Sequence, residues 1–205
     1  MKPDSIAIAL AGTVFGLVAG WVIGAQYTAT RAVPVAAAAA PASQSAQTPQ
    51  GRPEPPPLDQ AQAERLRADA DANPRSALPR IALANLYFDA ERYSEAVTWY
   101  EQALKLDAAN ADVSTDLGVS YYYLNQPDRA LEQFAHSLSV DPRHTKTMLN
   151  MGIVRAFGKQ DLEGASRAWE QVVAIAPSSP EGQAARRALD AMRTAHPPAA
   201  GQPGT

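Results

Sequence analysis

The sequence has 205 residues, 18 Lys and Arg against 21 Asp and Glu, a net charge of −3 and no cysteine. This near balance of charge argues against a nucleic-acid protein that depends on phosphate contacts. The lack of cysteine excludes disulfides, thiolate metal sites and thiol catalysis.

A short arm at residues 1–4 precedes a long apolar stretch, and no charged residue occurs from Ser5 to Thr30. About 20 apolar residues suffice to cross the hydrocarbon core as a helix, so we predict a transmembrane anchor at residues 5–27. A cleaved signal peptide is the alternative, although its apolar region is usually shorter. Lys2 favours a cytoplasmic N-terminus, so we expect a bacterial inner-membrane protein whose C-terminal part is periplasmic.

Within the predicted anchor, glycine recurs at every fourth position. A stripe of glycines allows two membrane helices to approach closely, which predicts association with a partner helix or a homodimer. The alternative is that glycine is simply common in membrane helices. The residues of this predicted helix-association site are Gly12, Gly16, Gly20 and Gly24.

Residues 28–57 are rich in Pro, Ala, Ser and Gln, a composition typical of a flexible to semi-extended linker. Its proline-rich end could instead be a recognition peptide, although such segments are more often spacers. A leading helical segment is predicted at 58–76, and the final residues, 196–205, form a predicted disordered tail.

Three helical pairs follow the leading segment, at residues 77–110, 111–144 and 145–179. Ala96 and Ala130 are 34 residues apart, and so are Tyr87 and Tyr121, which indicates an internal repeat. The third pair has one residue more than the others, which we expect in its loop, around residues 158–161. A last helix at 180–195 has a charged outer face, as the end of a solenoid requires.

The phase of these apolar and small residues resembles that of the tetratricopeptide repeat (TPR) family. The resemblance implies an all-α solenoid of helix-turn-helix repeats, with a capping helix and a concave groove made by the first helix of each repeat. The combination of anchor, linker and repeats is also similar in architecture to the TPR subunits of cytochrome c maturation.

Groove positions carried over from the family predict a partner-binding surface. Tyr122 and Tyr123 should face it, because Tyr121 points inward with Leu117 at 100° per residue. Asn85 and Lys146 alone do not form the clamp with which some family members hold a terminal carboxylate, so we expect a ligand with apolar anchors. The full predicted surface consists of Asn85, Phe88, Asp89, Thr115, Val119, Tyr122, Tyr123, Lys146, Leu149, Ile153 and Phe157.

No catalytic, cofactor-binding or metal site is predicted. His136, His144 and His196 are scattered and do not form a ligand set, and no phosphate-binding glycine loop is present. We therefore expect a membrane-tethered, non-enzymatic adaptor whose groove binds a peptide segment of another protein, in envelope protein assembly or cytochrome c maturation. The alternative is a self-assembling oligomeric scaffold, which associates through the glycine stripe and the repeats.

Overall fold

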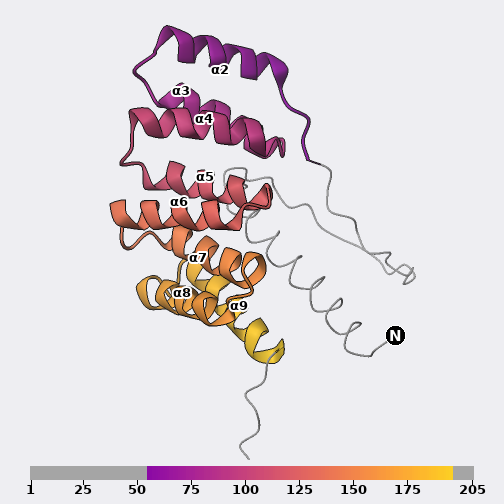
Figure 1. Ribbon diagram of the computed structural model, residues 1–205, viewed down its shortest axis with the longest axis vertical. Helices are drawn as coiled ribbons and strands as arrows, with labels where there is room; N and C mark the ends of the chain where they lie inside the picture. The colour runs from indigo at the N-terminus through magenta and orange to yellow at the C-terminus, as the bar shows by residue number, and fades with distance from the viewer. Residues whose placement is uncertain (1–54, 196–205) are drawn as a thin grey trace, which may run out of the picture. The chain divides into compact units, whose positions relative to one another are not determined.

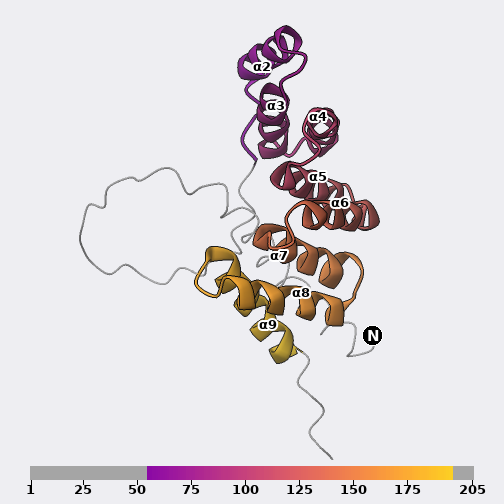
Figure 2. The same ribbon diagram turned by 90° about the vertical axis from the view of Figure 1, so that its left-hand side faces the viewer.

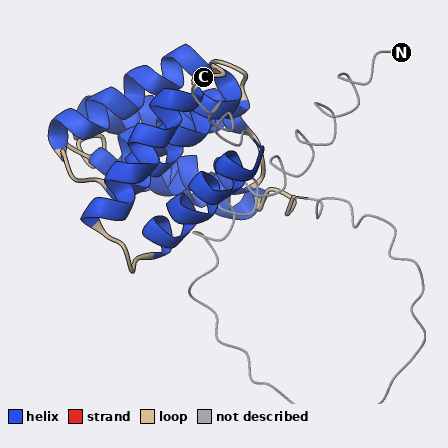
Figure 3. Ribbon diagram, turned by 90° about the horizontal axis from the view of Figure 1, so that it is seen from below, coloured by secondary structure: helices blue, strands red, loops and turns tan. Residues whose placement is uncertain are grey.

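A computed structural model describes residues 55–195, which form eight α-helices, one π-helical turn and no strand (Figure 1). Short loops join the helices throughout this part of the chain (Figure 3). The helices are α2 (Gln60–Ala72), α3 (Leu78–Asp89), α4 (Tyr93–Leu106), α5 (Ala111–Tyr123), α6 (Pro127–Val140), α7 (Thr145–Ile153), η1 (Val154–Gly158), α8 (Leu162–Ile175) and α9 (Pro180–Ala195).

The helices pack in the order of the chain, as expected for a solenoid. Each helix from α2 to α9 contacts the next one, and α5 packs against α7 and α7 against α9. Because each pair contacts only its neighbours, the apolar face of one pair is buried by the next. Figure 2 shows α3, α5 and α7 along one side of the stack and α4 and α6 along the other. We call the side made by α3, α5, α7 and η1 the first-helix face.

Aromatic side chains of the second helices form the centre of each repeat. Tyr100, Phe134 and Trp169 are at most 1% exposed, and each follows a fully buried alanine by four residues. In the second and third repeats they lie against glycines of the first helix. A Cβ atom added to Gly118 would be 2.5 Å from the Phe134 ring, and one added to Gly152 would be 2.2 Å from Nε1 of Trp169. These glycines therefore permit the close approach of the paired helices.

The turn between paired helices has one geometry in all three repeats. Glu91, Asn125 and Gln160 have positive φ angles of 55°, 58° and 56°. Each lies two residues before the first residue of the second helix, so the third loop has the same length as the other two. The expectation of a longer loop at residues 158–161 is therefore wrong. The extra residue is accommodated by the π-helical turn η1, in which Lys159 N donates to the Val154 carbonyl, five residues back.

Helices α2 and α9 lie at the two ends of the stack. α2 begins at the cap residue Asp59, whose carboxylate accepts a hydrogen bond from Gln62 N. The outer residues of α9, among them Arg186, Asp190 and Arg193, are exposed, as predicted for a polar end. Such an end prevents the solenoid from continuing by adding another copy.

The predicted arm (1–4), the membrane anchor (5–27) with its glycine stripe, most of the linker (28–57) and the tail (196–205) lie outside the described residues. They therefore remain predictions. Within residues 55–195, no helix is long and apolar enough to cross a membrane.

Candidate partner-binding surface

An aromatic cluster lies at the C-terminal ends of α3 and α5. It consists of Phe88, Tyr93, Tyr122 and Tyr123. The rings of Tyr93 and Tyr123 are stacked, with centroids 4.4 Å apart, and Phe88 meets both edge-on at 5.4 and 6.0 Å. Tyr122 lies 6.1 Å from Tyr123. The three tyrosines are half-buried, and burial raises the pKa of the Tyr122 hydroxyl. Such rings, partly covered and ending in a polar group, are well suited to binding another protein.

Tyr93 was not among the predicted binding residues. It is the first residue of α4, a second helix, whereas the family positions are all taken from first helices. The turn after Glu91 brings Tyr93 back onto the end of α3, where its ring stacks on Tyr123 of the next repeat. An aromatic residue directly after this turn is the sequence signal that would have identified it.

Phe157 extends the aromatic row into the third repeat. It lies in η1, and 38% of its surface is exposed. Phe157 lies three residues before Gln160, whose backbone is in the left-handed region. Tyr122 has the same position relative to Asn125, which is the left-handed residue of the second repeat. Its neighbour Gly158 packs so closely on the second repeat that an added Cβ would be 3.3 Å from the Tyr122 ring.

Several predicted contact residues are buried. Phe88, Val119 and Ile153 are 4–7% exposed, Leu149 is 1% exposed and Thr115 is not exposed at all. These side chains are almost fully covered within the fold, and their contact with a partner stays a prediction. For Thr115 the cause is its bonding, since its hydroxyl donates to the Ala111 carbonyl and lies 2.6 Å from that of Thr147. Phe88 still shapes the surface, because it supports the two stacked tyrosines.

The polar residues of the predicted surface have partners within the fold. Asn85 accepts a hydrogen bond of 2.6 Å from the Tyr100 hydroxyl. Nζ of Lys146 lies 2.7 Å from Asp116 and 3.9 Å from Asp112, which is largely exposed. Asn85 and Lys146 are thus each engaged with a different partner within the fold.

Asp89 ends α3, directly after Phe88, and much of its surface is exposed. Partial burial of its carboxyl group, followed by the negative charge of Asp116, raises the pKa of Asp89. Asp89 and Asp116 therefore repel each other between neighbouring first helices. Lys146 offsets much of the charge of Asp116, and Asp112 lies at the other end of α5, so among the acidic residues of α3 and α5 it is Asp89 that borders the aromatic cluster.

A buried hydroxyl network joins the second and third repeats. Thr147 lies 2.8 Å from the Ser137 hydroxyl and 2.5 Å from Nδ1 of His144, whose Nε2 is 3.3 Å from Asp112. The Asp–His–Thr order resembles a catalytic triad, and the sequence did not suggest it. Thr147 is completely buried, so no substrate can reach its hydroxyl, and the network serves to satisfy buried polar groups. Within residues 55–195, no group of three or more acidic, His or Cys side chains could hold a metal ion.

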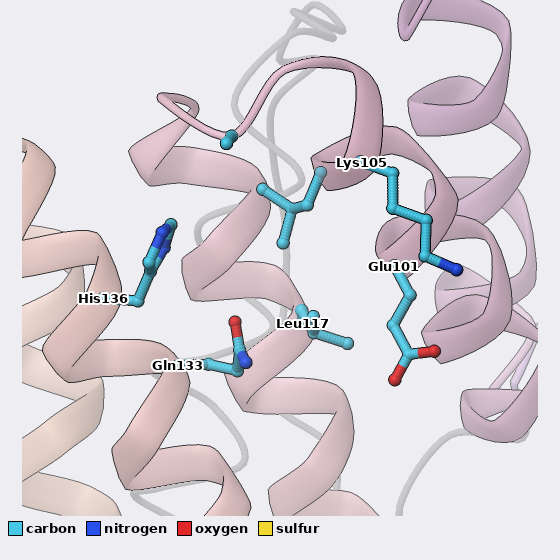
Figure 4. A pocket seen from close by; sticks show the side chains of 7 residues that line it. Glu101, Lys105, Leu117, Gln133 and His136 are labelled. Carbon is cyan, nitrogen blue, oxygen red and sulfur yellow. The ribbon is translucent and has the colours of Figure 1, made fainter.

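A cleft of about 330 Å³ lies on the other side of the stack (Figure 4). Glu101 and Lys105 of α4 face Gln133 and His136 of α6 across an apolar floor that includes Leu117. Glu101 also accepts a hydrogen bond from the buried Tyr121, which fixes one wall of the cleft. None of its lining residues belongs to the aromatic cluster, and its polar groups show no arrangement suited to catalysis.

Comparison with known proteins agrees with this architecture. Residues 84–125 match the family model described as TPR repeat. Over 117 residues the chain is 30% identical to the heat-shock protein cognate co-chaperone sgt12 of Aspergillus fumigatus. This match covers 53% of this chain and 34% of that protein. The chain thus spans about a third of the length of this relative.

Solved structures show the same fold at lower identity. The crystal structure of MamA has a TM-score of 0.55 and 14% identity, and the match covers 64% of this chain and 87% of that one. The first TPR of Spaghetti (RPAP3), solved with an HSP90 peptide, has a TM-score of 0.51 and 24% identity. This match covers 57% of this chain and 93% of that one. TPR domains mediate protein–protein interaction. The described residues therefore fold as a TPR-like α-solenoid, with a TPR repeat matched at residues 84–125.

Proposed function

We propose that the chain is a non-enzymatic adaptor that binds a peptide segment of a partner protein on its first-helix face. The aromatic cluster is the observation that supports this function best. Tyr93, Tyr122 and Tyr123 keep part of their rings accessible, and the exposed Phe157 continues the row in the next repeat. Aromatic anchors near the centre of a surface carry much of the binding energy in protein interfaces.

The comparisons support the same class of function. The Spaghetti TPR was solved with a bound peptide, and sgt12 is a co-chaperone. For this chain, binding would use the stacked pair Tyr93 and Tyr123 as a rigid platform, because each ring is already held by its neighbours. A preordered platform loses little conformational entropy when the partner binds.

Site-specific photo-crosslinking tests this proposal. A photoreactive amino acid at Tyr122 should yield a discrete crosslinked partner in cells, and Tyr123→Ala in the same chain should remove that product. The matched control carries the same amino acid at Thr98, which is exposed on α4, on the other side of the stack. The same products from both positions, or a product from Tyr122 that survives Tyr123→Ala, would refute binding at the cluster.

We also propose that residues 5–27 tether the repeats to a bacterial inner membrane, with the repeats on the periplasmic side. This proposal rests on the uncharged stretch and on Lys2, and it would place the adaptor in envelope protein assembly or cytochrome c maturation. Resistance of the chain to alkaline extraction from membranes, and cleavage of the repeats by protease added to spheroplasts, are the expected results.

A self-assembling scaffold remains the second candidate, through the glycine stripe from Gly12 to Gly24. Light scattering of the full chain in detergent distinguishes the two functions. An adaptor that does not assemble gives the mass of one chain, whereas a scaffold gives a mass that rises with concentration and falls when the glycines are replaced by leucine.

A further inference from the structure

Building on the proposed function, we propose that the segment bound by the aromatic cluster is positively charged, with a Lys or Arg next to an aromatic or aliphatic anchor. The aromatic cluster alone does not determine the charge of the partner. Asp89, which directly follows Phe88 of the cluster, supplies that information.

The acids lie on the same first-helix face as the rings. Asp89 directly follows Phe88 at the end of α3 and therefore borders the cluster, whereas Asp112 and Asp116 lie farther away, in the first half of α5.

The cations of α3, α7 and η1 are engaged within the fold. Arg80 donates to three backbone carbonyls before α3, and Nη1 of Arg155 lies 2.8 Å from Asp161. Nζ of Lys146 lies 2.7 Å from Asp116, so these two charges largely offset each other.

The carboxylate of Asp89 determines which ligands the surface beside the cluster favours. Partial burial, followed by the negative charge of Asp116, raises the pKa of Asp89, so the charged form of Asp89 would be stabilised by a cation beside it. A Lys or Arg of the partner would supply that cation, and opposite charges across an interface favour the correct partner over a wrong one. An acidic segment would place a second negative charge beside Asp89.

The rings favour the same ligand. A cation placed over the face of a tyrosine ring is attracted by the ring quadrupole, whereas an anion is not. Within the fold, Arg129 already uses this interaction, with its guanidinium carbon 3.9 Å from the Tyr121 ring. An Arg of the partner could therefore lie over a cluster tyrosine with its charge toward Asp89, while an apolar neighbour packs on the stacked pair.

Selection of peptides from a random library tests the charge of the ligand. The full chain in detergent micelles is immobilised and presented with phage that display random dodecapeptides, and the Tyr123→Ala chain serves as the counter-selection. We expect the peptides that depend on Tyr123 to carry more Lys and Arg, and fewer Asp and Glu, than the starting library.

Asp89 is then tested with one selected peptide, labelled with fluorescein and measured by anisotropy. The variant Asp89→Asn should weaken the binding of this peptide by about two- to fivefold, because a single charge pair at the surface contributes up to about 1 kcal/mol. Asp89 is exposed, so the fold should be preserved. Asp190→Asn on α9 removes the same kind of charge from an exposed site elsewhere and should leave binding unchanged.

The possible failures can be told apart. Peptides that depend on Tyr123 but are neutral or acidic would overturn the inference on charge and leave the proposed function intact. Equal binding to Asp89→Asn and to the wild type would also overturn it. If no selected peptide depends on Tyr123, the proposed function fails, and this inference fails with it.

Discussion

Replacing Gly152 by alanine tests how the third repeat is packed. In the interior of an exposed helix, this change stabilises a protein by about 0.5–1 kcal/mol. Here the new methyl group would lie 2.2 Å from Nε1 and 2.6 Å from two carbons of the Trp169 indole. Trp169 is rigid and 1% exposed, so it cannot move aside without disturbing its neighbours. We therefore expect the substitution to destabilise the repeat.

The magnitude follows from two costs and one gain. Overpacking a core costs about 1–3 kcal/mol. Moving the indole also breaks the buried hydrogen bond of 3.1 Å from Trp169 Nε1 to the Leu149 carbonyl, which costs about 1–3 kcal/mol when a partner is left unsatisfied. After subtraction of the gain in helix propensity, Gly152→Ala should lower the free energy of unfolding by about 1–5 kcal/mol.

Urea denaturation followed by circular dichroism measures this change, and a second substitution identifies its cause. Trp169→Leu removes the ring that the methyl group would meet. In that background Gly152→Ala should be close to neutral, so the double-mutant cycle should give a coupling of at least about 1 kcal/mol. The control is Ala84→Gly, the reverse substitution at the equivalent position of the first repeat, which should lower the free energy of unfolding. Stabilisation by Gly152→Ala in the wild-type chain would refute the reasoning.

Two other perturbations probe the buried polar groups. Thr147→Val removes a hydroxyl that has three side-chain partners, and it should lower the free energy of unfolding in urea by about 1–3 kcal/mol. The control, Thr194→Val at an exposed position, should lower it by less than about 0.5 kcal/mol. Burial, and then the hydrogen bond to Glu101, raise the pKa of Tyr121 to about 12. The stabilisation from this neutral phenol is present below pH 10 and is lost as pH rises through about 12. Ultraviolet titration should therefore show a lower Tyr121 midpoint after Glu101→Gln, and an unchanged midpoint would contradict the assignment.

The helical solenoid could be predicted from the sequence because its signals repeat. Two independent pairs of positions are 34 residues apart, and each buried alanine precedes an aromatic by one helical turn. Each repeat contains several of these signals, so the spacing can still be recognised where a single position differs from the family pattern. The aromatic pair Tyr122 and Tyr123 could be assigned to an accessible face by the same helical phase.

The burial of several predicted contact residues could not be foreseen. Thr115 has a groove position in the family pattern, but its accessibility depends on Thr147, which is 32 residues away in the next repeat. A pattern within one repeat carries no information on such a contact. The stacking of Tyr93 on Tyr123 is a contact of the same kind, because it joins a second helix to the first helix of the following repeat.

The position of the extra residue in the third repeat connects the fold with the candidate site. Loops usually accommodate insertions, so the residue count alone suggested a longer loop. The π-helical turn instead preserves the left-handed turn at Gln160 and leaves Phe157 three residues before it, the place that Tyr122 holds in the second repeat. Counting from the start of the repeat would have assigned that place to Ala156. The wider turn thus keeps an exposed aromatic ring in phase with the cluster, and π-helical turns often occur at functional sites for such a reason.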